Sequence, residues 1–295
     1  MFIASTKSTL RPHLSHAQAE LTRQIAVVNE HGVREQVSIP AERALTVYVD
    51  KREIVTLMTL GAHPELLVLG YLRNQRLVSV VDEVESITVD WTAGEDGAGV
   101  AAVKTRHGIA DMAARTEKRI VTTGCGQGSV FGDLMTEIDS VDLPDARINQ
   151  ARLYGVLTAI RLQESTYKSA GSVHACALFS GEHMQVFVED VGRHNAIDTI
   201  AGWMWMNDTT ADANSIFYTT GRLTSEMVMK AAQMGVAVVV SRSGITQMGY
   251  DLATRLTVCT IGRATNKHFL CYTASQRMHL DPPLALGGVQ KVTGA

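Results

Sequence analysis

The chain has 295 residues, 45% of them hydrophobic and 19% charged, which is enough to build one large domain or two unequal ones. Its net charge of -3 excludes the broad positive field of a nucleic-acid-binding protein. The sequence contains neither an apolar run of roughly 18 residues that would cross a bilayer nor a signal-peptide core near its start. We therefore expect a cytoplasmic protein without a nucleic-acid or membrane partner.

The N-terminal part is predicted to be rich in β-structure. Residues 1–43 show no sustained hydrophobic period, so we expect a mobile leader there. Residues 44–120 are predicted to form a β-rich domain because apolar and polar residues alternate in several short runs. The expected elements are a hairpin that turns at Asp50-Lys51, a short helix beginning near Pro64, and strands at 84–91 and 99–107.

Residues 121–275 follow a different pattern, in which strand-like and helix-like segments alternate. The strand-like runs are 172–179, 184–190, 215–220, 236–241, 258–262 and 268–273. The helix-like runs are 153–160, 194–206, 224–235 and 245–256, with Thr224 as the expected N-cap of the third. This alternation predicts an α/β domain with a parallel or mixed sheet and helices on both faces. Residues 276–295 are expected to be a C-terminal tail.

The four cysteines form neither a CxxC pair nor a regular framework, which is typical of reduced thiols. Cys176 and Cys259 lie in apolar runs, where we expect buried, unreactive side chains. Cys125 differs because glycines flank it, and a glycine-rich loop leaves its thiol accessible. An accessible thiolate can accept sulfur as a persulfide or form another covalent intermediate. The alternative is a glycine-rich linker with an incidental cysteine.

Arginine stands beside glycine at three strand-to-helix turns. The side chains concerned are Arg193 with its neighbour His194, Arg222 and Arg242. Such turns lie at the ligand-binding edge of an α/β sheet, where backbone N–H groups and cations attract anions. We expect the three turns to converge on one phosphate-bearing or pterin ligand. The alternative for each is an ordinary polar turn, with Arg193 in a surface ion pair to Asp190 or Asp198.

His174 and Cys176 are similar to part of the motif of a zinc-dependent deaminase. That chemistry requires glutamate at the position of Cys176, together with a Pro-Cys-x-x-Cys segment that this sequence lacks. We therefore expect no metal site.

Three segments carry a resemblance to a known family: EDVGRHNAID, TTGRLTSEMVMKAAQMG and VVVSRSGITQMGYDLATRLTVCTIGR. In this order and spacing they resemble the formate dehydrogenase accessory sulfurtransferase family, FdhD. The resemblance runs from about Thr46 to Tyr272 and includes LMTLGAHPELLVLGYL and TTGCG. It implies that sulfur is taken from a cysteine desulfurase and passed to the bis-guanine-dinucleotide form of the molybdenum cofactor, which activates formate dehydrogenase.

The resemblance also assigns residues. Cys125 matches the persulfide-bearing cysteine, the first of a Cys-Gly-x-Cys motif whose second cysteine is Gly128 here. One persulfide on Cys125 suffices chemically. The cofactor-binding stretch corresponds to Arg263, Ala264, Thr265, Asn266, Lys267 and His268. The family further implies a homodimer and a cytidine-deaminase-like C-terminal domain without zinc.

Two functions therefore stand as hypotheses. The first is a sulfurtransferase in which Cys125 carries the sulfur and the arginine-bearing turns hold the anionic groups of the cofactor. The second is a chaperone that binds and delivers the molybdenum cofactor without transferring sulfur. Replacing Cys125 separates them, because only the first requires its thiol.

Overall fold

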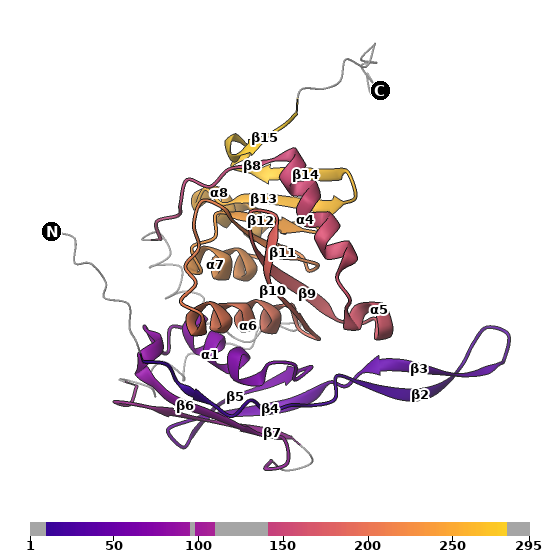
Figure 1. The fold of residues 1–295 in the computed structure, drawn as a ribbon, viewed down its shortest axis with the longest axis vertical. Helices are drawn as coiled ribbons and strands as arrows, with labels where there is room; N and C mark the ends of the chain where they lie inside the picture. Colours follow the sequence, from indigo (N-terminus) through magenta and orange to yellow (C-terminus); the bar gives the residue numbers. More distant parts are fainter. Residues whose placement is uncertain (1–9, 95–97, 110–140, 282–295) are drawn as a thin grey trace.

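The computed structural model describes residues 10–94, 98–109 and 141–281. Two β-sheets form its main layers, and helices α1 (Pro64–Asn74) and α6 (Arg193–Met206) lie between them (Figure 1). The N-terminal sheet packs below α1, and the C-terminal sheet lies on the far side of α6. The mixed α/β architecture expected from the sequence is confirmed.

The N-terminal sheet has five strands in the order β1-β6-β7-β4-β5. Its strands are β1 (His13–Leu14), β4 (Arg43–Val49), β5 (Arg52–Thr59), β6 (Val84–Asp90) and β7 (Gly99–Thr105), with the 3-10 turn η1 (Val81–Glu83) before β6. The expected hairpin is confirmed, because β4 and β5 are antiparallel and Asp50 and Lys51 have positive φ angles of 47° and 72°. Helix α1 begins at Pro64 as predicted, since proline needs no N–H partner at the first helical position.

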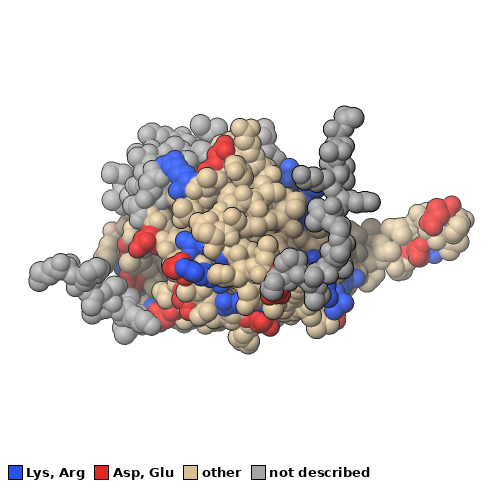
Figure 2. All heavy atoms as spheres, turned by 90° about the horizontal axis from the view of Figure 1, so that it is seen from above, with Lys and Arg blue, Asp and Glu red and all other residues tan. Residues whose placement is uncertain are grey.

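Residues 10–43 differ from the mobile leader that the sequence predicts. Strand β1 pairs with β6, while β2 (Thr22–Val28) and β3 (Arg34–Pro40) form an antiparallel arm that projects from the body (Figures 1 and 2). Ser15 Oγ and Ala17 N each donate a hydrogen bond of 2.6 Å to the Glu65 carboxylate. These bonds fasten the segment to α1 through a contact between residues about fifty positions apart, which a local hydrophobic pattern does not reveal.

The C-terminal sheet has six strands in the order β10-β9-β11-β12-β13-β14. The strands are β9 (His174–Ser180), β10 (His183–Asp190), β11 (Ser215–Thr219), β12 (Val238–Ser241), β13 (Cys259–Thr265) and β14 (His268–Thr273). Strands β11, β12 and β13 are parallel to one another. The remaining pairs are antiparallel: β10 with β9, β9 with β11, and β13 with β14. The predicted strand segments are thus confirmed, and the sheet is mixed.

Helices cover both faces of this sheet. Helix α6, α7 (Ser225–Gln233) and α8 (Gln247–Arg255) pack on one face, around buried residues such as Phe217, Met227 and Val239. The opposite face carries α4 (Gln150–Leu162), followed by the short α5 (Thr166–Ala170), and the two-stranded β8 (Ile148–Asn149) and β15 (Met278–His279), with η4 (Ser275–Arg277) beside them. None of the described helices is long and apolar enough to cross a membrane.

Helices α1 and α6 touch backbone to backbone where glycines face each other. A Cβ atom built on Gly70 would lie 1.6 Å from the Asp198 carbonyl oxygen, and one on Gly202 would lie 2.0 Å from that of Leu66. Only glycine permits this approach. Helix α1 covers one side of α6 and the sheet covers the other. More residues of α6 are therefore buried than the apolar face that its hydrophobic period predicts.

Candidate functional site

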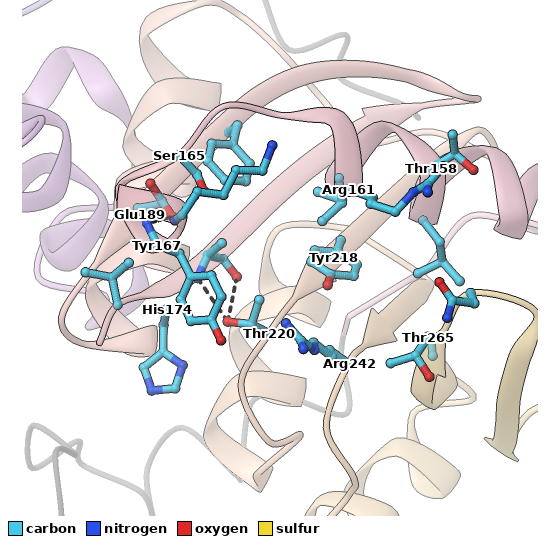
Figure 3. A pocket seen from close by; sticks show the side chains of 18 of the residues that line it. Thr158, Arg161, Ser165, Tyr167, His174, Glu189, Tyr218, Thr220, Arg242 and Thr265 are labelled. Carbon is cyan, nitrogen blue, oxygen red and sulfur yellow. Dashed lines mark hydrogen bonds between the residues drawn. The ribbon is translucent and has the colours of Figure 1, made fainter. Parts of the chain in front are cut away.

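A cavity of about 790 Å³ lies on the α4 face of the six-stranded sheet (Figure 3). The strands supply its floor, α4 and α5 supply its wall, and the turn between β13 and β14 closes one side. Its lining includes the ends of β11 and β12, where parallel strands present their carboxyl termini. This is the edge at which open α/β sheets bind ligands, and the volume is that of a small-molecule site.

The described lining of this cavity is positively charged. It contains four cationic side chains, those of Arg161, Lys168, Arg242 and Lys267. The carboxylate in the lining belongs to Glu189, and it already accepts hydrogen bonds from Thr166 N at 2.5 Å and Tyr167 N at 3.1 Å at the start of α5. Glu189 is held by these backbone groups and Lys168 Nζ also lies 3.4 Å from Glu164, so the lining keeps an excess of positive charge that would suit an anion such as a phosphate.

Aromatic side chains complete the wall. They belong to Tyr154, Tyr167, Phe187 and Tyr218. Burial raises the pKa of Tyr218 to about 12, an effect that nearby Arg242 opposes, so Tyr218 is a neutral phenol at pH 7. Tyr154 donates a hydrogen bond of 3.1 Å to the Lys267 carbonyl oxygen and thereby ties α4 to the β13–β14 turn. Flat aromatic surfaces beside cations suit a ligand that combines a heterocycle with phosphate groups.

Backbone hydrogen bonds hold the strand ends in register at this edge. Arg242 N donates to the Thr219 carbonyl oxygen at 3.0 Å, which connects the turn after β12 to the end of β11. Arg263 N donates to the Ser243 carbonyl oxygen at 2.7 Å and connects β13 to the same turn. Figure 3 accordingly shows Arg242 between Thr220 and Thr265 on the floor of the cavity. The sheet therefore fixes the backbone position from which the Arg242 side chain extends.

The cofactor-binding residues predicted from the sequence fall in more than one place. Arg242 and the four residues of segment 264–267 line the cavity. Arg263 and His268 flank that segment, and Asn266 takes a positive φ of 52° at the turn. The structure thus brings Arg242 and the β13–β14 turn together, although they are more than twenty positions apart. Ligand binding by these residues stays a prediction.

Arg193 and Arg222 lie near His174, which lines the cavity, although neither arginine is among the lining residues. A Cβ atom on Gly221 would lie 2.8 Å from Arg193 Cδ, which places the second and first arginine-bearing turns in contact. Burial lowers the pKa of His174, and the charges of Arg193 and Arg222 lower it further. The His174 ring points away from Tyr218 and Arg242 in Figure 3. The three turns lie side by side, because Ser241 Oγ also donates a hydrogen bond of 2.7 Å to the Gly221 carbonyl oxygen, but Arg242 is the arginine of the three that lines the cavity.

The sequence predicts that His194 contributes to an anion-binding turn, but the structure places it in the protein core. Its side chain is 2% exposed, and Nε2 is 3.5 Å from Glu226 Oε2. Glu226 in turn is 3.5 Å from Lys230 Nζ, which forms an ion pair of 2.9 Å with Asp198. Burial lowers the pKa of His194 to about 2, and the positive charge of Lys230 adds to the effect. His194 is therefore neutral and is buried against α7.

Asp190 is also buried, so the surface ion pair considered as an alternative does not describe its surroundings. Its carboxylate accepts hydrogen bonds from Thr59 Oγ1 at 2.5 Å, Leu60 N at 3.1 Å, Gly192 N at 2.9 Å and Asn195 Nδ2 at 2.8 Å. Two of these donors lie at and just after the end of β5, and the other two are the N-cap Gly192 and Asn195 in the first turn of α6. Asp190 thus joins the two sheets, and burial still raises its pKa.

Cys125 and Gly128 lie outside the described residues. Cys176, expected to be buried and unreactive, is fully buried, and its Sγ donates to Thr219 Oγ1 at 3.4 Å. Burial raises the pKa of Cys176 to about 12, which suppresses its thiolate. Thr224 occupies the predicted N-cap of α7, but its side chain makes no capping hydrogen bond. Within residues 10–94, 98–109 and 141–281, no group of three or more His, Cys, Asp and Glu side chains could hold a metal ion.

Sequence reasoning missed Arg161, Lys168 and the tyrosines of the cavity. Arg161 is in the last turn of α4 and Lys168 is in α5, and both positions are typical of solvent-exposed charges. The available signal was the pair of basic residues on either side of the α4–α5 junction. It did not specify a site, because only the packing of α4 across the sheet brings these charges opposite Arg242 and Lys267.

Comparison with known proteins supplies an independent line of information. A family model described as FdhD/NarQ family matches residues 40–279. The sulfur carrier protein FdhD of Bacillus pumilus (strain SAFR-032) is 28% identical over 240 residues, covering 80% of this chain and 88% of the relative. The protein of the same name from Bacillus subtilis (strain 168) is 29% identical over 240 residues, with the same coverage of 80% and 88%.

A solved structure supports the same fold. The crystal structure of a formate dehydrogenase accessory protein from Desulfotalea psychrophila superposes with a TM-score of 0.66 at 23% sequence identity. The alignment covers 87% of this chain and 98% of that one, so it includes both sheets.

Proposed function

Because this chain belongs to the FdhD/NarQ family, we propose that it is a sulfur carrier that serves the maturation of formate dehydrogenase. Its relatives from Bacillus carry the name sulfur carrier protein FdhD, and the family model spans both sheets. In this proposal a cysteine desulfurase donates the sulfur in the cytoplasm. The recipient is the bis-guanine-dinucleotide molybdenum cofactor, which is a substrate of the reaction.

Cys125 carries the sulfur in this proposal. Its thiolate attacks the terminal sulfur of the desulfurase persulfide, a new S–S bond forms, and the desulfurase cysteine leaves as a thiol. The S–S bond on Cys125 then breaks, its terminal sulfane sulfur passes to the cofactor, and Cys125 is left as a thiol, which makes the protein a sulfurtransferase. Since Gly128 replaces the second cysteine of the family motif, a single thiol bears the sulfur throughout.

The cationic cavity is the observation that supports a nucleotide-bearing substrate. Arg161, Lys168, Arg242 and Lys267 supply charges for the phosphates, and the tyrosines supply surfaces for guanine or pterin. A cavity of about 790 Å³ suits one guanine-dinucleotide arm. The cofactor has two such arms, so a homodimer with one cavity in each protomer would match its symmetry.

Sulfur loading tests the role of Cys125. Wild type, Cys125→Ala and the matched control Cys176→Ala are incubated with a cysteine desulfurase and cysteine, and intact-protein mass spectrometry counts added sulfur atoms. Wild type and Cys176→Ala should each gain one sulfur that a reductant removes, because the Cys176 thiol is buried. Cys125→Ala should gain none. Equal loading of Cys125→Ala and wild type would refute the assignment.

The alternative is a chaperone that holds the molybdenum cofactor and delivers it without sulfur transfer. The cavity favours this reading as much as the first, because binding requires only its cations and aromatic walls. Activation of formate dehydrogenase separates the two. Cys125→Ala should abolish activation if the protein transfers sulfur, and it should leave activation intact if the protein only delivers the cofactor.

A further inference from the structure

Two cysteine side chains meet between neighbouring strands at the sheet edge. Cys259 begins β13 and Cys271 lies in β14, and these strands pair in antiparallel fashion with an irregular register beside Ile261. The two Sγ atoms are 4.0 Å apart. Both side chains pack against the hydrophobic core beneath α4. The distance is that of two sulfur atoms in contact, and a disulfide of about 2.05 Å needs a further approach of about 2 Å.

The two thiols have unequal surroundings. Cys259 is fully buried, whereas Cys271 is partly exposed. The hydrogen bond between them lowers the pKa of Cys271, against the effect of burial, and raises that of Cys259. The more accessible thiol is therefore also the more readily ionised one. Such a pair has one sulfur suited to attack an external reagent and one suited to attack the product.

We propose that Cys271 and Cys259 form a dithiol site that reduces the sulfane sulfur of a persulfide, with Cys271 as the attacking thiol and Cys259 as the resolving thiol. This site is separate from Cys125, so the proposal goes beyond the sulfur-carrier function. The sequence analysis expected Cys259 to be unreactive, and burial alone supports that expectation. The contact with Cys271 gives it a reaction partner that needs no access from solvent.

The reaction balances in two steps. The Cys271 thiolate attacks the terminal sulfur of a persulfide RSSH, an S–S bond forms on Cys271, and RSH leaves with the proton. Cys259 Sγ then attacks Cys271 Sγ, the Sγ–Sγ bond forms, and the terminal sulfur leaves as sulfide with the Cys259 proton. The two protein thiols are oxidised to a disulfide, and the sulfane sulfur accepts two electrons to become hydrogen sulfide.

Trypsin makes the product easy to assign. Cleavage after Arg263 and Lys267 places Cys259 and Cys271 on different peptides, LTVCTIGR and HFLCYTASQR. A disulfide between them joins these peptides covalently. Glutathione persulfide is the probe, and Cys125→Ser is the parent protein so that the sulfur-carrier cysteine does not contribute. Peptides are mapped without reductant, and released sulfide is quantified.

The parent should yield the joined peptides and one sulfide for each disulfide. Adding Cys259→Ser should leave one sulfane sulfur on Cys271, with release of sulfide reduced at least about tenfold because the resolving thiol is absent. Adding Cys271→Ser should abolish both products. Adding Cys176→Ser is the matched control and should behave like the parent, because Cys176 is remote in the sheet and bonded to Thr219.

The proposal fails if the peptides stay separate or if Cys271→Ser reacts like the parent. Cys259→Ala is a second resolving-thiol variant should serine disturb the core, and iodoacetamide should modify Cys271 before Cys259 in the folded protein. Loading of Cys125 by a desulfurase is measured separately in the Cys259→Ser, Cys271→Ser protein. Because that loading does not use the dithiol, its result distinguishes failure of the dithiol from failure of the sulfur-carrier function.

Discussion

The two faces of the six-stranded sheet both bear charged side chains but place them in different surroundings. On the α6 face, Lys230 is fully enclosed and pairs with Asp198 at 2.9 Å, while Asn74 donates a hydrogen bond of 2.6 Å to the same carboxylate. On the α4 face, Arg161 and Arg242 line an open cavity. Charges on the first face are paired within the protein, whereas those on the second line a space large enough for a ligand.

The difference follows from what covers each face. Helix α6 is enclosed by the sheet on one side and by α1 on the other, so a charge there loses its hydration and needs a partner within the protein. Helix α4 is the outermost layer of the opposite face, and water reaches the cavity beneath it. The cations of this cavity are therefore accessible from solution, as the proposed phosphate-bearing substrate would require.

Breaking the buried ion pair should have the largest effect. Lys230→Met leaves the Asp198 carboxylate enclosed without its counterion, so the free energy of unfolding should fall by about 3–5 kcal/mol in urea titrations. The exposed pair between Lys104 and Glu85 provides the control, and Lys104→Met should change the free energy by less than about 1 kcal/mol. Equal effects of the two substitutions would show that the α6 face does not isolate its charges.

The contact between α1 and α6 comes next. Gly202→Ala places a methyl group where the Leu66 carbonyl oxygen lies 2.0 Å away, and backbone must move to admit it. We expect a loss of about 1–3 kcal/mol, although alanine favours a helix by about 1 kcal/mol over glycine. Gly244→Ala is the control, since the nearest atom to its Cβ is Tyr272 Oη at 3.9 Å. A stabilised Gly202→Ala protein would contradict the close approach.

Acid should lower the free energy of unfolding through His194, which is buried on the α6 face of the sheet. The pKa of its buried ring is about 2 in the folded protein and 6.5 in the unfolded chain, so the unfolded state binds the extra proton between these values. The free energy of unfolding should therefore fall as pH drops below 6.5, at up to about 1.4 kcal/mol per pH unit from this residue. His194→Gln should make the acid side of the stability profile shallower by that slope. Substitution of the exposed His183 by Gln is the matched control for the loss of a histidine.

A substitution in the cavity on the α4 face should change ligand binding and have little effect on the free energy of unfolding. Arg242→Met should weaken the binding of guanosine diphosphate about tenfold in calorimetric titrations, because one phosphate contact is lost. Arg34→Met, on the projecting β2–β3 arm, should bind like wild type. The free energy of unfolding of Arg242→Met should stay within about 0.5 kcal/mol of wild type. Unchanged affinity would show that the cavity does not hold the phosphates.

The sequence determined much of the local structure. The alternation of residues around Asp50-Lys51 predicted the β4–β5 hairpin, and Pro64 marked the first turn of α1. The strand and helix segments of the C-terminal domain were predictable for the same reason, since hydrophobic period records which face of each element is buried. The family motifs also directed attention to segment 263–268, most of which lines the cavity.

Only the tertiary structure determined which charged groups and thiols lie close to one another. Arg161 became part of the cavity, His194 became a neutral core residue, and Cys259 came into contact with Cys271. Each outcome depends on which distant segment lies opposite, and a pattern of near neighbours in the chain does not contain that information. Hydrophobic burial is encoded residue by residue, but the partner of a charge or a thiol is chosen by the packing of whole helices and sheets.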